Sequence, residues 1–286
     1  MIVLRVSAQE DGTTPESTRN PPGDWPGSMA PSGAILRPMS GHSKWSQIKR
    51  QKGVNDVKRG AVFTKMGREI SVAARAGGGD PDGNFRLRLA IERARAENMP
   101  LDTIKRAIEK ATGGGDGAQY EEITYEGYGP HGVAIIVETA TDNKNRTAAD
   151  VRSILVKAGG SLAVSGSVAW QFEQRGVILL APGGDPDEMS LVAIDAGADD
   201  VDTSADQGEV YTKPNELEAV RRSLEAGGVK IESAELSMIA KNTVELDESK
   251  ARQAMRLVEL LEDLEDVQRV TANFEIPEAL LAEVGG

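Results

Sequence analysis

The stretch GVAIIVETATDNKNRTAADVRSILVKA, residues 132–158, decides the fold. Residues 132–141 are mostly apolar and rich in β-branched side chains, which predicts a buried strand. Residues 146–158 place Val151 and Leu155 on one apolar stripe, as in an amphipathic helix. A strand followed directly by a helix indicates an α/β unit.

The same alternation continues toward the C-terminus. A strand over residues 167–172 would complete a β-α-β unit. Residues 173–236 then predict a β-α-β-β-α-β order with strands at 177–181, 200–204, 209–212 and 230–236, and helices at 186–196 and 214–226. Residues 237–276 add a strand, a helix and a strand at 237–246, 248–264 and 267–276.

This order predicts two ferredoxin-like α/β domains, one inserted in the other. The outer domain would comprise residues 116–172 plus 237–276, and the inserted domain residues 173–236. Residues 277–286 would form a tail. The segment YEGYGPHG, residues 125–132, is expected to be a turn-rich lead-in to the first strand, with His131 as a loop residue.

The N-terminal part has a different character. Residues 39–115 are predicted to form a basic helical domain with helices at 58–76, 85–97 and from about 100–102 to 113, separated by glycine-rich stops. The fold class is therefore α+β. Residues 1–38 are rich in Pro, Gly, Ser and Thr and are predicted to be a disordered extension, with Met39 a candidate start.

Composition excludes several function classes. The 286 residues include no cysteine and only two histidines, which excludes disulfides, thiol catalysis and cysteine-based metal sites. No apolar stretch is long enough to span a bilayer. The acidic run ELLEDLED, residues 259–266, is interpreted as a solvated helix face rather than a magnesium site. No catalytic constellation, cofactor site or metal site is expected.

The formal net charge of −12 hides a strong internal asymmetry. Residues 39–112 carry 16 basic and 8 acidic side chains, whereas residues 113–286 carry 14 basic and 33 acidic ones. Within residues 39–75 the count is nine basic side chains against two acidic ones. An isolated basic run is usually a solvated surface, but this contrast favours binding to phosphate backbones.

The predicted nucleic-acid-binding residues of this basic block are Lys44, Trp45, Lys49, Arg50, Lys52, Lys58, Arg59, Lys65 and Arg68. Lys44 lies in GHSKWSQIKRQKG, where Ser and Gln side chains would also donate to phosphates. Lys144 and Arg146 belong to DNKNRT, residues 142–147, which joins the first strand to its helix. The Asn and Thr side chains there suit an N-cap, and the basic pair at a helix N-terminus also suits a phosphate. Both alternatives stay open.

Several blocks of this sequence resemble the YebC/PmpR family. They are GHSKWSQIKRQKGVNDVKRGAVFTKMGREISVAARAGGGDPDGNFRLRLAI at 41–91, NMPLDTIKRAIEKATGG at 98–114, YEGYGPHGVAIIVETATDNKNRTAADVR at 125–152, GSVAWQFEQRGVI at 166–178 and LEDLEDVQRVTANFEI at 261–276. The resemblance covers residues 39–276 and implies a cytoplasmic protein with a helical domain and two α/β domains. Residues 1–38 have no counterpart in the family pattern.

The resemblance implies a non-enzymatic function. Family members are described as DNA-binding transcriptional regulators, and others look like translation factors acting at the ribosome. We therefore expect a DNA-binding transcriptional regulator that binds through its basic helical domain. The alternative is a ribosome-associated factor that binds rRNA and aids synthesis of proline-rich stretches. A metal-dependent phosphoesterase using the acidic run is the least favoured alternative. The oligomeric state stays open.

Overall fold

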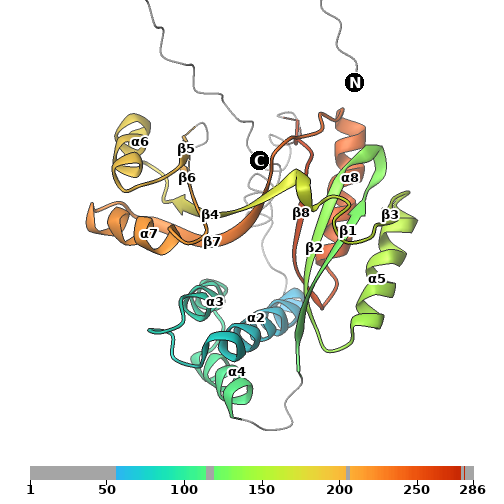
Figure 1. Cartoon of the computed structure of the whole chain (residues 1–286), viewed down its shortest axis with the longest axis horizontal. Coiled ribbons are helices and arrows are strands. Elements are labelled where there is room, and N and C mark those ends of the chain that lie inside the picture. Colours follow the sequence, from blue (N-terminus) through green and yellow to red (C-terminus); the bar gives the residue numbers. More distant parts are fainter. Residues whose placement is uncertain (1–55, 114–118, 204–206, 278–279, 281–286) are drawn as a thin grey trace, which may run out of the picture. The chain divides into compact units, whose positions relative to one another are not determined.

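The computed structural model of the protein describes residues 56–113, 119–203, 207–277 and 280. In these residues, three helices precede two four-stranded antiparallel sheets, as Figure 1 shows. The predicted α+β fold class is confirmed. Within the described ranges, no helix has both the length and the apolar character needed to cross a bilayer.

The helical part consists of α2 (Asp56–Gly77), α3 (Phe85–Ala96) and α4 (Leu101–Thr112). Their apolar stripes share one core, formed by Met66, Ile70, Ala73, Ala74, Leu87, Ala90, Ile91, Ala94, Met99 and Ile104. Asn84 joins the first two helices, because its side chain caps α3 at Leu87 N and donates to the backbone oxygens of Ala73 and Gly78. The glycine-rich stretches end helices, as predicted.

The first sheet has the order β3-β1-β2-β8. Its strands are β1 (Glu121–Tyr128), β2 (Ala134–Thr141), β3 (Ser161–Leu162) and β8 (Val267–Ala272). A short 3₁₀ turn, η1 (Pro130–Gly132), links β1 to β2. Helices α5 (Lys144–Lys157) and α8 (Glu248–Glu262) pack on this sheet (Figure 1).

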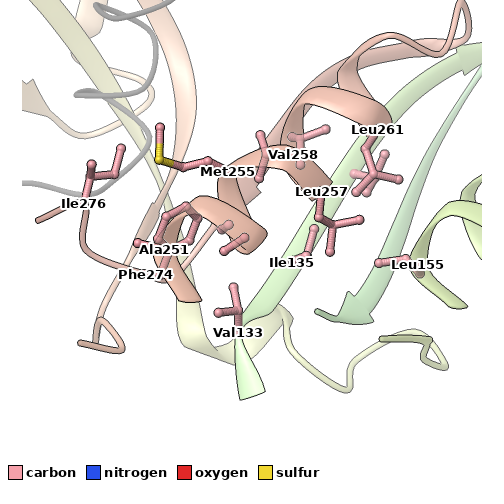
Figure 2. Close-up of a cluster of buried hydrophobic side chains, with 14 of the residues drawn as sticks. Val133, Ile135, Leu155, Ala251, Met255, Leu257, Val258, Leu261, Phe274 and Ile276 are labelled. Atoms are coloured by element: carbon pink, nitrogen blue, oxygen red, sulfur yellow. The ribbon is translucent and has the colours of Figure 1, made fainter. Parts of the chain in front are cut away.

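Strand β2 is buried on both faces, which explains its nearly continuous apolar sequence. Ile135 and Val137 pack against α5 and α8, with Leu257 and Leu261 of α8 in the same cluster (Figure 2). Ala134 and Ile136 point to the opposite side and pack with residues of the second sheet and its entry, Val168, Phe172, Met238 and Ala240. One face of β2 therefore packs against α5 and α8, and its other face packs against the second sheet.

The second sheet has the order β5-β6-β4-β7. Its strands are β4 (Phe172–Leu180), β5 (Asp200–Asp202), β6 (Glu209–Thr212) and β7 (Ile231–Ala240), and its helices are α6 (Pro186–Asp195) and α7 (Leu217–Ala226). All of these elements lie in the chain between β3 and α8. Leu89 and Phe85 of α3 join the core of this sheet, so the helical part also packs against it.

The strand predicted over 167–172 is wrong. Ala169–Gln171 forms a 3₁₀ turn, η2, and β4 begins only at Phe172. The amides of Val168 and Ala169 donate to the buried carboxylate of Glu126, at 2.7 and 2.9 Å, and are not available to a strand ladder. A side chain distant in the sequence therefore replaces the strand partner.

The separate strands predicted at 230–236 and 237–246 are also wrong. Residues 231–240 form one strand, β7, which pairs with β4 from Phe172↔Ala240 to Leu180↔Ile231. No Gly, Pro, Asn or Asp interrupts this stretch, so the strand continues through the expected boundary. The first sheet is completed instead by β1, which pairs with β2 along its whole length.

Residues 125–128 lie in strand β1, so the prediction of a turn-rich lead-in is wrong for them, whereas residues 129–132 form the expected turn with His131 in η1. Gly127 suggested a turn, but it lies in the strand for a packing reason. A Cβ atom there would lie 2.9 Å from Leu155 Cδ1 and from the backbone oxygen of Ser161. Only glycine lets α5 and β3 approach this closely.

Candidate nucleic-acid interface

The structure places the predicted basic residues in different environments. Lys44, Trp45, Lys49, Arg50 and Lys52 lie outside the described residues. Lys58 and Arg59 lie in the first turns of α2, where the backbone alone is described. Lys65 and Arg68 follow on the same helix and contact the turn between α8 and β8.

Lys65 and Arg68 hold α2 against that turn. Lys65 Nζ donates to the backbone oxygen of Glu262. Arg68 is buried, and its guanidinium donates to Glu265 O at 2.8 Å and to Asp266 Oδ1 at 2.5 Å. The Arg68 guanidinium also lies 5.3 Å from the centre of the Tyr120 ring. These contacts link the helical part to the first sheet.

Asp266 collects side chains from three separate elements. Besides Arg68, it accepts from Arg146 Nη2 at 2.8 Å, Thr147 Oγ1 at 2.6 Å and Thr141 Oγ1 at 3.1 Å. We call these five residues the Asp266 junction. It joins the basic helix, the DNKNRT segment and the acidic run, which are separate blocks in the sequence.

The solvated-face interpretation of the acidic run is therefore wrong for Asp266, which is only 6% exposed. Helix α8 ends at Glu262, so Asp266 does not continue the helical stripe of carboxylates. Burial raises the pKa of Asp266, but hydrogen bonds from Thr147 and Arg146 and the charges of Arg68 and Arg146 outweigh it. The net pKa lies below its ordinary value, so the carboxylate is ionised at neutral pH.

The DNKNRT segment forms the N-terminus of α5. Asn143 is the N-cap, and its side chain accepts from Arg146 N at 3.1 Å. The Arg146 guanidinium pairs with Asp142 and Asp266. Lys144 is exposed, and its ammonium has no ion pair among the residues that the structure describes. The capping alternative is thus observed, while a phosphate contact by Lys144 or Arg146 stays a prediction.

A groove of about 350 Å³ runs between α2 and α4. No acidic side chain lines it. The basic side chains that line it are Arg68, Arg75, Arg106 and Lys110. Hydroxyl groups of Thr64, Ser71 and Thr103 line it as well. Arg106 and Lys110 are exposed and have no ion pair in the described part of the chain. Of the two cavities described for the residues that the structure covers, the α2–α4 groove is the more strongly basic.

Sequence reasoning missed Arg106 and Lys110, although a signal for them existed. Thr103, Arg106 and Lys110 recur at spacings of three and four residues, which places them on one face of α4. The local charge of α4 is unremarkable because acidic side chains lie elsewhere on the helix. The net charge of the segment therefore did not reveal that Arg106 and Lys110 lie on one face of the helix.

A second cavity, of about 330 Å³, lies where α2, α3 and both sheets meet. Its lining mixes both signs of charge and pairs them, as in Arg93–Glu69 at 2.9 Å and Arg269–Glu235 at 2.8 Å. Burial raises the pKa of Glu138 in its wall. This cavity does not favour phosphate. Among the described residues, no group of three or more acidic or histidine side chains could hold a metal ion.

Two family models match the chain. The model described as the TACO1/YebC protein N-terminal domain matches residues 43–114. The model described as the TACO1/YebC second and third domain matches residues 120–274. The α2–α4 groove lies almost entirely within the first match, and the two sheets lie within the second.

Curated relatives and a solved structure match over most of their own length. A "probable transcriptional regulatory protein" of Rubrobacter xylanophilus is 54% identical over 87% of this chain and 100% of the relative. One of the same description from Roseiflexus castenholzii is 56% identical over 85% of this chain and 97% of the relative. The crystal structure of a conserved hypothetical protein of Aquifex aeolicus matches with a TM-score of 0.72 and 46% identity, over 78% of this chain and 92% of that one.

Proposed function

The chain belongs to the TACO1/YebC family, and from this membership we propose that it is a transcriptional regulatory protein that binds DNA through its helical domain. The observation that carries the proposal is the α2–α4 groove, whose lining includes Arg75, Arg106 and Lys110 and no acidic side chain. The second cavity offers no comparable attraction, because its three basic side chains are offset by four acidic ones.

The chemistry of the groove suits a phosphodiester backbone. Arg75, Arg106 and Lys110 supply positive charge, and hydroxyl groups such as that of Thr103 supply neutral donors. Contacts of this kind position a protein on nucleic acid without reading its sequence. The basic block that includes Lys44, Lys49, Arg50, Lys52, Lys58 and Arg59 would extend the same contact.

We assign a different role to Arg68 and Arg146. Both guanidiniums are engaged by Asp266, so they contribute mainly by fixing α2 against the first sheet. They are positioning residues in this proposal rather than primary phosphate contacts. Lys144, which is exposed at the start of α5, remains a proposed contact.

The first test measures duplex DNA binding by fluorescence anisotropy at several salt concentrations. The double variant Arg106→Ala/Lys110→Ala should bind more weakly and should lower the salt slope by about one unit per lost contact. Lys105→Ala is the matched control, because Lys105 lies on the same helix and does not line the groove. An unchanged slope in the double variant, or an equal loss in Lys105→Ala, would count against the groove.

The same variants separate DNA from the ribosomal alternative. Sedimentation of ribosomes with the protein should leave it unbound if duplex DNA is its target. Ribosome binding that withstands DNase and is lost in Arg106→Ala/Lys110→Ala would assign the groove to rRNA instead.

A further inference from the structure

The connection between β3 and β4, residues 163–171, displays two large apolar side chains. Val164 is 78% exposed and Trp170 is 65% exposed. No residue of this segment, AVSGSVAWQ, is charged. We call it the Trp170 loop. When a partner covers an exposed tryptophan, more apolar surface is removed from water than for most other residues. Such a residue therefore marks a candidate binding surface.

The loop is held in one conformation by a buried carboxylate. Glu126 of β1 is 5% exposed, and its oxygens accept from the amides of Gly166, Val168 and Ala169 at 2.6, 2.7 and 2.9 Å. Burial raises the pKa of Glu126, but these backbone hydrogen bonds outweigh it and hold the pKa below its ordinary value. A buried carboxylate without hydrogen bonds is costly in free energy. The loop is therefore held in the conformation that supplies these three amide donors.

The indole N–H of Trp170 and the hydroxyl of the neighbouring Tyr128 already have hydrogen-bond partners inside the protein. Trp170 Nε1 donates to Ser167 O at 3.0 Å, and Tyr128 OH donates to the same oxygen at 3.2 Å. The indole has no other donor. What Trp170 offers to a partner is therefore the face of its ring rather than a hydrogen bond.

A positive charge is hydrogen-bonded to the backbone of the same residue. Lys241 Nζ donates to the backbone oxygen of Trp170 at 3.2 Å, and Lys241 is exposed. An ammonium group has further donors to offer. The loop is anchored on both sides of Trp170, because Val168 within it and Phe172 directly after it are buried in the core between the sheets. The arrangement combines a rigid aromatic face with an adjacent cation.

We propose that the Trp170 loop is a stacking site for an unpaired nucleobase, with Lys241 contacting the phosphate beside that base. A flat aromatic ligand matches a ring whose polar edge is satisfied, and a phosphate complements the ammonium group. The proposal rests on the proposed nucleic-acid function and adds to it a contact with single-stranded nucleic acid, made by the α/β part of the chain.

Tryptophan fluorescence tests the proposal directly. The chain has three tryptophans, so the Trp170 signal is taken as the difference between the unsubstituted protein and Trp170→Phe, which leaves the predicted contact Trp45 in place. A single-stranded oligonucleotide should quench this signal, because stacking places a base against the indole. A duplex of the same sequence should quench it little, because its bases are already stacked. Anisotropy of a labelled oligonucleotide, measured in parallel, reports whether binding occurs at all.

Affinity provides the second readout. Trp170→Ala should weaken single-strand binding about 5- to 150-fold, the effect of losing one base–aromatic stack, and should leave duplex binding unchanged. Trp170→Phe should retain most of the affinity. Leu191→Ala is the control, since Leu191 is a similarly exposed apolar residue on α6.

The outcomes distinguish the two proposals. Oligonucleotide binding without quenching of Trp170 would overturn the stacking site and leave the groove proposal intact. Absence of binding to any nucleic acid would overturn both. Self-association of the protein that is lost in Trp170→Ala would assign the loop to a second copy of the chain and would also overturn the stacking site.

Discussion

Asp266 lies at the meeting point of α2, the start of α5 and the turn before β8, and its carboxylate binds two arginines and two threonines. Each of these partners could be located in the sequence, since Arg68, Arg146 and Asp266 all fall in recognisable blocks. Their convergence could not be predicted, because no periodicity relates side chains separated by 120 residues or more. Charge runs alone made Asp266 resemble a surface residue.

Replacement of Asp266 should destabilise the protein in a pH-dependent way. Because the folded pKa is lowered, the carboxylate contributes stability above its unfolded pKa of about 3.9 and loses it as pH falls through the folded value. Asp266→Asn should therefore cost about 3 kcal/mol at pH 7 and less below about pH 4. Urea unfolding of both proteins at several pH values measures this difference.

Asp263→Asn serves as the control, since Asp263 is exposed and lies three residues away in the same turn. It should change stability little at any pH. A cost for Asp266→Asn that is the same at pH 7 and pH 3.5 would contradict the assigned pKa direction.

At the scale of elements, helices were predicted more accurately than strands. Helix α3 keeps its predicted start at Phe85, and α8 keeps its predicted start at Glu248, because apolar periodicity and capping residues are local signals. Strand β1 was missed because its glycine, Gly127, serves packing rather than a turn. The boundaries of β7 were missed because strand pairing, unlike helix capping, depends on a distant partner.

Helix α8 provides a matched pair of substitutions. Leu257 is 1% exposed and packs on the first sheet (Figure 2). Leu260 on the same helix is 45% exposed. Leu257→Ala should lower the free energy of unfolding by about 2–5 kcal/mol, because it leaves a cavity in the core. Leu260→Ala should cost less than about 1 kcal/mol. Similar costs in urea unfolding for both would place the core elsewhere.

At the scale of the whole molecule, the helical part is held to both sheets by charged contacts. Arg68 pairs with Asp266 beside the first sheet, and Arg221 of α7 pairs with Glu92 of α3 at 2.6 Å beside the second. Helical periodicity and the order of expected strands and helices predict three parts between residues 39 and 276. These contacts could not be predicted, because the local patterns that predict each helix or strand carry no information about which distant side chain it meets.

Loss of Arg68 should loosen one of these attachments selectively. Arg68→Met keeps an unbranched stem that can fill the same space, but it removes the guanidinium and leaves Asp266 without one of its buried charge partners. Hydrogen exchange should become faster in α2 and in the turn before β8, while β4 and β7 keep their protection. Arg222→Met, which removes an exposed pair on α7, should leave exchange unchanged throughout. Uniformly faster exchange in Arg68→Met would indicate global destabilisation instead.

In the sequence, the strands of the second sheet lie between β3 and β8 of the first sheet, and this order determines which sheet can form first during synthesis. Strands β4 and β7 pair at Phe172↔Ala240, so every strand of the second sheet has been made once Ala240 is added. The first sheet is still incomplete at that moment, because Ala134 must wait for Asn273, a hydrogen-bond partner 139 residues later. Closing so long a loop is slow compared with forming local contacts. The inner sheet is therefore the first of the two to be able to form, and the last strand made, β8, completes the sheet whose first strand was made earliest.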